Sequence, residues 1–251
     1  MKASKKTSNG KGKMAKKLDV LVLAAHRDDI EITCGGTVIK LVDMGYKVGI
    51  VDFTQGEMGT KGTEIDRARE AEAAAKVMGI SVRENLKMPD AGLEMTRENV
   101  LRVAEVIRRF KPHLLILPYW EQRHPDHAMC PRLSWDAAFL AGLKKANLPG
   151  EHHRPYKIIY STSFHDVRHS FIGDITDQFK RKKEAVACYS SQFDETPESK
   201  DIFPPARNIF EFMEVQNRAL GYRIGKPYGE AFYTKEIAEV ADPMKLTVKS
   251  I

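Results

Sequence analysis

Short apolar runs and longer segments with helical spacing alternate along the chain. Five runs rich in β-branched residues are bounded by turn signals and predict strands at residues 18–24, 47–53, 82–86, 113–117 and 157–161. Between these runs, apolar residues recur at the spacing of a helix at residues 36–44, 64–78, 97–110 and 126–143. Strands that alternate with helices are typical of βαβ units. The pattern therefore predicts a single α/β domain with a Rossmann-like, mostly parallel sheet flanked by helices.

Two further helices are predicted nearer the C-terminus, at residues 176–190 and 207–221. Residues 193–205 lie between them and are polar and proline-rich, which predicts a surface loop. We expect the two helices to cover an edge of the sheet or to form a contact between copies of the chain. No repeat or linker divides residues 18–251, so we expect one domain there.

Positive charge is concentrated at the N-terminus. Seven lysines and no acidic residue occur in residues 1–17, and removing them from the formal net charge of +6 leaves −1 for residues 18–251. A segment with so little apolar surface predicts a disordered basic tail. We do not expect nucleic acid as a partner, because the tail has no interleaved aromatic residues and no recognisable binding module.

The cysteines and the hydropathy pattern indicate a cytoplasmic protein. Cys34, Cys130 and Cys188 are odd in number and form no CxxC pair, which argues against a disulfide framework. The sequence has no apolar run of 18 residues, and its N-terminus lacks the apolar region of a signal peptide. We therefore expect no membrane partner.

Residue types that bind metals follow two of the predicted strands. They are His26, Asp28 and Asp29 after the first strand, and His124, Asp126 and His127 after the fourth. The carboxyl ends of parallel strands share one edge of the sheet, where ligands bind in such folds. Either aspartate of the first motif could simply cap the next helix. The second motif favours a metal, because two imidazoles and one carboxylate suit a catalytic zinc or iron(II) ion with open positions.

The two motifs together resemble the LmbE/PIG-L family of metal-dependent N-deacetylases. The resemblance rests on Ala25-His26-x-Asp28-Asp29-x-Glu31 and on His124-Pro125-Asp126-His127, and it extends over about residues 18–233. The sequence is most similar to the bacillithiol-pathway deacetylases, which act on N-acetylglucosaminyl-malate. Arg27 stands where the family usually has proline, so we expect the geometry of this loop and the substrate specificity to differ from those usual in the family.

The resemblance implies a role for each candidate residue. One divalent ion, Zn²⁺ or alternatively Fe²⁺, would be held by His26, Asp29 and His127. Asp28 would accept a proton from water, and His124 would donate to the oxyanion, with Asp126 orienting its ring. Arg67 and Arg123 would bind an amino-sugar conjugate that carries a dicarboxylate. The resemblance also implies a homo-oligomer, either a trimer or a hexamer.

Two other functions are open at this point. Histidine and aspartate clusters also hold metals in phosphoesterases, although two-metal sites usually need more carboxylates than this sequence offers. A nucleotide- or nucleic-acid-binding protein could use the Gly35-Gly36 turn and the basic tail, but the sequence has no GxGxxG or Walker motif.

Overall fold

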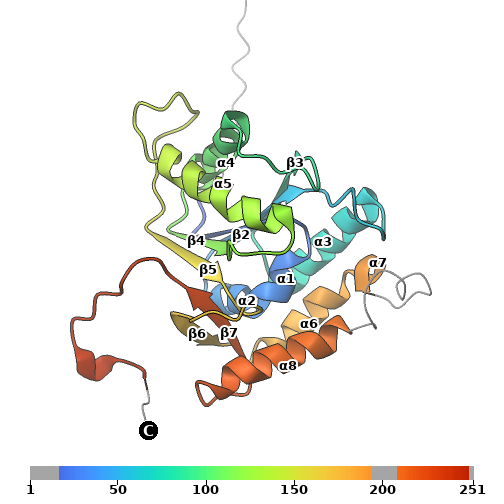
Figure 1. Ribbon diagram of the computed structural model, residues 1–251, viewed down its shortest axis with the longest axis vertical. Coiled ribbons are helices and arrows are strands. Elements are labelled where there is room, and N and C mark those ends of the chain that lie inside the picture. Colours follow the sequence, from blue (N-terminus) through green and yellow to red (C-terminus); the bar gives the residue numbers. More distant parts are fainter. Residues whose placement is uncertain (1–16, 194–207, 249–251) are drawn as a thin grey trace, which may run out of the picture.

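Seven strands form one sheet in the order β3-β2-β1-β4-β5-β7-β6 (Figure 1). The computed structural model describes residues 17–193 and 208–248, so nearly all of the predicted tail and of the predicted loop at 193–205 lie outside the described residues. The strands are β1 (Val20–Ala24), β2 (Val48–Thr54), β3 (Val82–Met88), β4 (Leu114–Pro118), β5 (Lys157–Ser161), β6 (Phe171–Asp174) and β7 (Gly229–Tyr233). Strands β1 to β5 pair in parallel, and β7 runs antiparallel to β5 and β6. The mostly parallel sheet is confirmed.

The helices follow the predicted pattern, with two differences. They are α1 (Asp29–Thr33), α2 (Gly35–Asp43), α3 (Glu64–Met78), α4 (Arg97–Phe110), α5 (Pro125–Ala141), α6 (Phe179–Ala187), α7 (Ser190–Phe193) and α8 (Ile209–Tyr222). The short helix α1 was not predicted, and the helix expected at 176–190 is divided into α6 and α7. No helix in the described ranges is long and apolar enough to cross a membrane.

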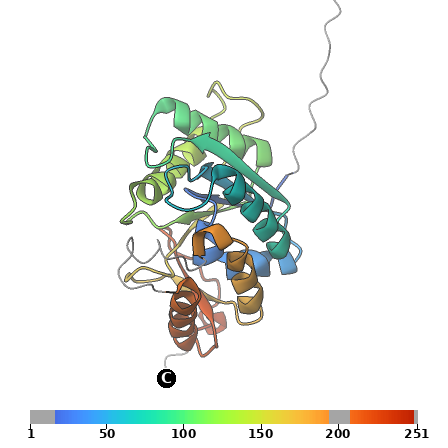
Figure 2. The same cartoon turned by 90° about the vertical axis from the view of Figure 1, so that its right-hand side faces the viewer.

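Alternate residues of the central strands pack into two separate cores. Leu21 and Leu23 of β1 face α4 and α5, whereas Val20 and Val22 face α1, α2, α3 and α6. Figures 1 and 2 show these two helical layers on opposite sides of the sheet. A strand buried on both faces reads as a continuous apolar run, which explains why β1 and β4 were evident in the sequence.

A buried ion pair joins the sheet to the helical layer near the C-terminus. Lys182 of α6 donates to Glu230 of β7 at 2.6 Å, and both side chains are fully buried. The Glu230 carboxylate also accepts the backbone N–H groups of Gly36 and Thr37, at 2.9 and 2.7 Å, in the first turn of α2. Asn217 of α8 completes the cluster by accepting from Lys182 and donating to the carbonyl of Gly229. Four elements are therefore held at one point.

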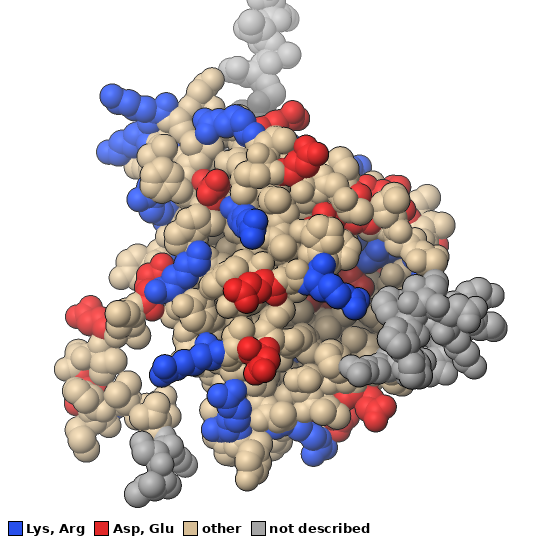
Figure 3. All heavy atoms as spheres, in the orientation of Figure 1, with Lys and Arg blue, Asp and Glu red and all other residues tan. Residues whose placement is uncertain are grey.

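The visible face carries acidic and basic side chains interspersed, with no large field of one sign (Figure 3). This agrees with the near-neutral charge calculated for residues 18–251.

Candidate metal-binding site

The predicted metal-binding residues meet at the carboxyl edge of the sheet. His26 lies two residues beyond β1, and Asp29 begins α1. His124 is the N-cap of α5, and Pro125 occupies the first turn, where its missing N–H is not needed. His127 follows one turn later on the same helix face as His124. The local folding of both loops thus turns their polar side chains toward one point.

Three donor atoms lie close enough together to share one ion. His26 Nδ1 is 2.9 Å from His127 Nε2, which is 3.1 Å from Asp29 Oδ1. Asp29 Oδ2 is 3.6 Å from His26 Nδ1. A tetrahedral zinc ion about 2.0–2.1 Å from nitrogen and oxygen ligands separates those ligands by roughly 3.3 Å. The spacing and chemistry of this donor set therefore fit a single divalent cation.

Two carboxylates outside this donor set hold the His26 ring. His26 Nε2 lies 2.9 Å from Asp90 Oδ1 and 3.7 Å from Asp126 Oδ2. Burial disfavours the imidazolium, but hydrogen bonds to Asp126, Asp29 and Asp90 outweigh it and raise the pKa of His26 to about 12. A neutral His26 that donates from Nε2 to Asp90 keeps the Nδ1 lone pair directed at Asp29 and His127. Binding a cation at Nδ1 therefore requires loss of a proton.

Two other sets of metal-ligating atoms also include His26. Within residues 17–193 and 208–248, His26 groups with His124 and His127, and separately with Asp90 and Asp126. The second set uses the opposite ring nitrogen of His26 from the set described above. A metal bound at this edge would use His26 in every arrangement.

Asp126 is placed differently from our expectation. Its carboxylate accepts the backbone N–H groups of Ala91 and Leu93, at 2.7 and 3.1 Å, and faces His26 rather than His124. The Asp126 backbone N–H donates to His124 Nδ1 at 3.2 Å. The main chain of Asp126 therefore orients the His124 ring. The side chain of Asp126 is hydrogen-bonded to the loop after β3 instead.

His124 is arranged to donate a proton from its other nitrogen. Burial lowers the pKa of His124, and the neighbouring His26 and His127 lower it further. Because Nδ1 accepts the Asp126 amide, the proton of the neutral ring resides on Nε2.

Arg67 is buried against Asp28. It does not line the cavity that Asp29 and His127 border. Its side chain is 6 % exposed and donates to Asp28 Oδ1 at 3.1 Å and to the carbonyl of Gly56 at 3.1 Å. Gly56 has φ +74°, and a Cβ built there would lie 1.9 Å from Arg67 Nη1, so glycine makes room for the guanidinium. The expected contact of Arg67 with substrate is therefore replaced by a contact with Asp28.

Arg27, at the position of the family's usual proline, points inward. Its guanidinium donates to the carbonyl of Glu64 at 2.7 Å, and its own carbonyl accepts from Arg83 and Tyr189. The residue is buried, so its charge does not face a substrate. These hydrogen bonds anchor the loop that proline would otherwise stiffen.

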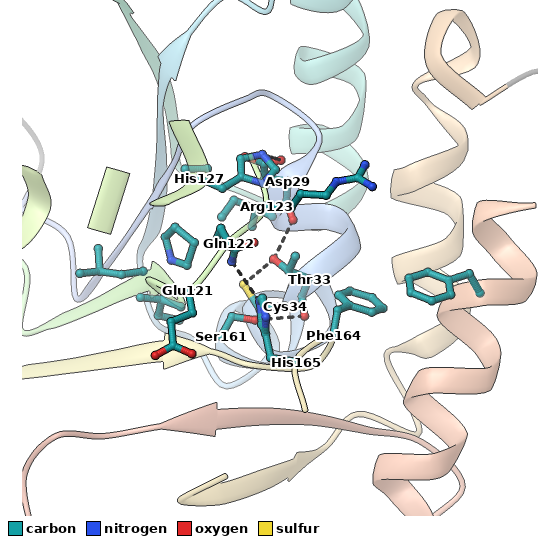
Figure 4. A pocket seen from close by; sticks show the side chains of 16 residues that line it. Asp29, Thr33, Cys34, Glu121, Gln122, Arg123, His127, Ser161, Phe164 and His165 are labelled. Carbon is teal, nitrogen blue, oxygen red and sulfur yellow. Dashed lines mark hydrogen bonds and ion pairs between the residues drawn. The ribbon is translucent and has the colours of Figure 1, made fainter. Parts of the chain in front are cut away.

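A cavity of about 610 Å³ opens beside Asp29 and His127 (Figure 4). Asp29 and His127 form one part of its wall, and Arg123 and Gln122, from the loop after β4, form another. Cys34 also lines it, but burial raises the pKa of this thiol to about 12, which disfavours the thiolate that a metal would need.

Sequence reasoning missed several residues of the site. Asp90 and His165 were not among the candidate residues of the sequence analysis. His165 lines the cavity and lies 3.0 Å from Gln122 Nε2. Phe164 and Phe212 also line it, and nothing in their local sequence indicated this.

Comparison with known proteins identifies the family. The family described as PIG-L, GlcNAc-PI de-N-acetylase, matches residues 21–138, which contain both histidine and aspartate motifs. The chain belongs to the PIG-L family. Among its relatives, diacetylchitobiose deacetylase of Thermococcus kodakarensis is 29% identical over 227 residues, covering 85% of this chain and 80% of that protein.

The chain is also similar to a solved structure and to a protein with a different activity. The crystal structure of a conserved protein from Thermus thermophilus superposes with a TM-score of 0.80 and 36% identity, covering 89% of this chain and 98% of that one. A 4-oxalmesaconate hydratase of Pseudomonas putida is 28% identical over 194 residues, covering 68% of this chain and 73% of that protein. The relatives of this chain thus include both a deacetylase and a hydratase.

Proposed function

We propose that this PIG-L protein is a metal-dependent deacetylase that removes the acetyl group from an N-acetylglucosamine conjugate. The observation that supports this most strongly is the convergence of His26 Nδ1, Asp29 and His127 Nε2 beside a cavity that can admit a sugar. We assign these three residues as the ligands of one divalent ion, Zn²⁺ in preference to Fe²⁺. The diacetylchitobiose deacetylase relative supports an amino-sugar substrate.

The reaction needs an activated water, a stabilised oxyanion and a protonated amine. A divalent ion held by His26, Asp29 and His127 would supply Lewis acidity toward water and the acetyl carbonyl. Asp28, held by Arg67 at 3.1 Å, accepts the proton of the attacking water. His124 donates from Nε2 to the carbonyl oxygen as negative charge develops there. Either Asp28 or His124 then gives a proton to the leaving amine.

The group attached to the sugar is the finer part of the proposal. We propose malate, as in N-acetylglucosaminyl-malate, and Arg123 supports it because this exposed guanidinium lines the cavity and has no acidic partner among the described residues. Burial of Arg67 leaves one guanidinium at the cavity where two were expected.

The two arginines should respond differently to replacement by alanine. Arg123→Ala should lower kcat/KM on N-acetylglucosaminyl-malate by roughly 10- to 150-fold more than on N-acetylglucosamine, because a charge-assisted hydrogen bond is lost. Arg67→Ala should lower kcat on both substrates by similar factors, because it acts through Asp28. Steady-state kinetics on the two substrates checks this. A selective loss on the malate conjugate in Arg67→Ala would restore Arg67 as a substrate-binding residue.

Hydration of a carbon–carbon double bond is a second candidate function, favoured by the hydratase relative. Proton NMR of reaction mixtures distinguishes the two activities. Deacetylation releases free acetate and an amine from N-acetylglucosamine, its malate conjugate or diacetylchitobiose. A hydratase instead consumes 4-oxalmesaconate and leaves the acetylated sugars unchanged, which would contradict the proposal.

We further propose a homo-oligomer, with a trimer or a hexamer as the expected size. The segment after β7 leads away from the sheet (Figure 1), and its Ile237, Met244 and Val248 side chains are exposed, Ile237 to 98%. Val215 and Tyr222 of α8 are exposed as well. Light scattering should give a mass three or six times the 28.4 kDa of the chain. A monomer mass that does not change with concentration would exclude this.

We also propose that the protein acts in the cytoplasm. All three cysteines are free, and Cys34 and Cys130 are buried. Reduced, buried thiols are expected in a reducing compartment.

A further inference from the structure

Three aromatic side chains surround the ammonium group of Lys235, which lies two residues beyond β7. Lys235 Nζ is 4.3 Å from the ring centroid of Trp135, on α5, and 4.9 Å from that of Trp120, in the loop after β4. It is also 5.3 Å from the ring centroid of Tyr160, on β5. A cation within about 6 Å of a ring centroid is attracted by the negative face of the ring. The three rings therefore form an aromatic cage around this cation.

No carboxylate accounts for the position of the ammonium group. Lys235 forms no ion pair or hydrogen bond with any residue that the structure describes, and it is exposed. Asp136 and the aromatic cage line one cavity of about 420 Å³, but Asp136 does not pair with Lys235. The Tyr160 hydroxyl is buried and has no hydrogen-bond partner within the described ranges, so the contacts of this residue are those of its ring. The rings thus hold the ammonium group.

The aromatic cage shares its backbone with the wall of the cavity beside the metal-binding residues. Trp120 belongs to the cage, and the next residue, Glu121, lines that other cavity (Figure 4). Tyr160 and Ser161 divide in the same way at the end of β5, because successive side chains of a strand point to opposite faces. No residue lines both cavities. The cage is therefore a separate site on the other side of the same backbone.

Trp120 begins the loop that carries Arg123 into the cavity beside the metal-binding residues. The Trp120 ring packs against Tyr119, with ring centroids 4.2 Å apart. The carbonyl of Tyr119 accepts a hydrogen bond from Gln122 Nε2 at 2.9 Å. A cation that holds the Trp120 ring therefore restrains the residues that lie between it and Arg123.

We infer that the aromatic cage is an ammonium-binding site, filled by Lys235 of the same chain, and that Lys235 is a positioning residue for the loop at residues 119–123. The ligand class of the cage is an alkylammonium ion, so a free alkylammonium ion binds there once the lysine side chain is removed. The positioning role rests on the proposed deacetylase function, because this loop supplies Arg123 to the substrate cavity.

Tryptophan fluorescence reports on the cage, because Trp120 and Trp135 are the two tryptophans of the chain. Lys235→Met keeps a long apolar side chain without its charge, Lys235→Arg keeps the charge, and Lys235→Ala empties the cage. Lys157→Met is the matched control, because Lys157 Nζ lies 6.0 Å from the single ring of Tyr156 and outside the cage. The emission spectra are recorded on the full metal-loaded chain without substrate.

We expect Lys235→Met to change the tryptophan emission, and Lys235→Arg and Lys157→Met to resemble the wild type. Butylammonium chloride should return the emission of Lys235→Ala toward that of the wild type and saturate. The same concentrations of 1-butanol or sodium chloride should not, because the cage recognises a cation on an alkyl chain. Wild-type emission in Lys235→Met would overturn the ammonium site. A response of Lys235→Ala to 1-butanol as large as to butylammonium, or to neither, would also overturn it.

Steady-state kinetics tests the positioning role. Lys235→Met should raise KM for N-acetylglucosaminyl-malate by roughly 2- to 5-fold, the factor expected for losing an exposed cation–π contact. Its kcat, and its KM for N-acetylglucosamine, should change little, because the metal ligands are not touched. Lys235→Arg should restore the wild-type KM. Equal KM values in Lys235→Met and the wild type would contradict the positioning role.

Failure of this inference is distinguishable from failure of the proposed function. A wild-type protein that releases no acetate contradicts the deacetylase, and the positioning role with it. The fluorescence measurements need no turnover, so they still decide the ammonium site. Deacetylation by the wild type, with wild-type emission in Lys235→Met, contradicts the ammonium site alone.

Discussion

Asp28→Asn should keep its metal and lose turnover, whereas Asp29→Ala should lose both. The two residues are adjacent and chemically identical, but their contacts differ. Asp29 lies 3.1 Å from His127 and 3.6 Å from His26 Nδ1, among the proposed ligand atoms. Asp28 turns toward Arg67 instead. An asparagine at position 28 keeps the shape of the side chain but cannot take a proton from water, so kcat should fall by about 10²–10⁴-fold.

Elemental analysis beside steady-state kinetics checks both variants. Removing Asp29 deletes one of three protein ligands, so metal content should fall together with activity. Asp19→Asn is a suitable control, because this aspartate accepts the backbone N–H of Lys47 and lies outside the site. Loss of metal in Asp28→Asn with retention in Asp29→Ala would reverse the two roles. Full activity in both would refute the mechanism.

Lys182→Met should destabilise the fold by about 3–5 kcal/mol, because it leaves the Glu230 carboxylate buried without its cation. Glu230 would keep only the amides of Gly36 and Thr37. For a chain of this size the change corresponds to a decrease in Tm of roughly 6–20 °C. Thermal and urea unfolding monitored by circular dichroism measure it.

The neighbouring Lys183→Met is the matched control. Lys183 is more than one-third exposed and lies 3.6 Å from Glu214, so its loss should cost at most about 1 kcal/mol. Lys182→Met combined with Glu230→Gln should be less destabilised than the sum of the two single variants, because neither then leaves a lone buried charge. Wild-type stability in Lys182→Met would show that the pair contributes nothing.

The fold was predictable wherever the local pattern and the packing agree. Strands β1 and β4 are buried on both faces and read as apolar runs, and α4 spans Arg97–Phe110, the range predicted from the sequence. The short strands β6 and β7 were missed, because β6 is only partly buried and β7 contains the charged Glu230. Glu230 is tolerated in a buried strand only because Lys182 and the first turn of α2 meet it there. Such partners are far away in sequence.

The site was predictable where one short motif supplies several residues. His26 and Asp29 come from one loop, and His124 and His127 from one helix turn, so their grouping follows from the order of the strands. The contact of Asp126 with His26 was not predictable, because it depends on how the loop after β3 presents the Ala91 and Leu93 amides. Phe212 reaches the cavity only through the packing of α8, which no local pattern encodes.

Titration of the metal-free protein with Zn²⁺ or Fe²⁺ tests the central claim most directly. Mass spectrometry of the N-acetylglucosamine conjugates follows the free amine as metal is added. The account predicts no amine without metal, and a rate that rises with occupancy and saturates near one ion per chain. Amine formation at the full rate in the metal-free protein, or none at any occupancy, would contradict it.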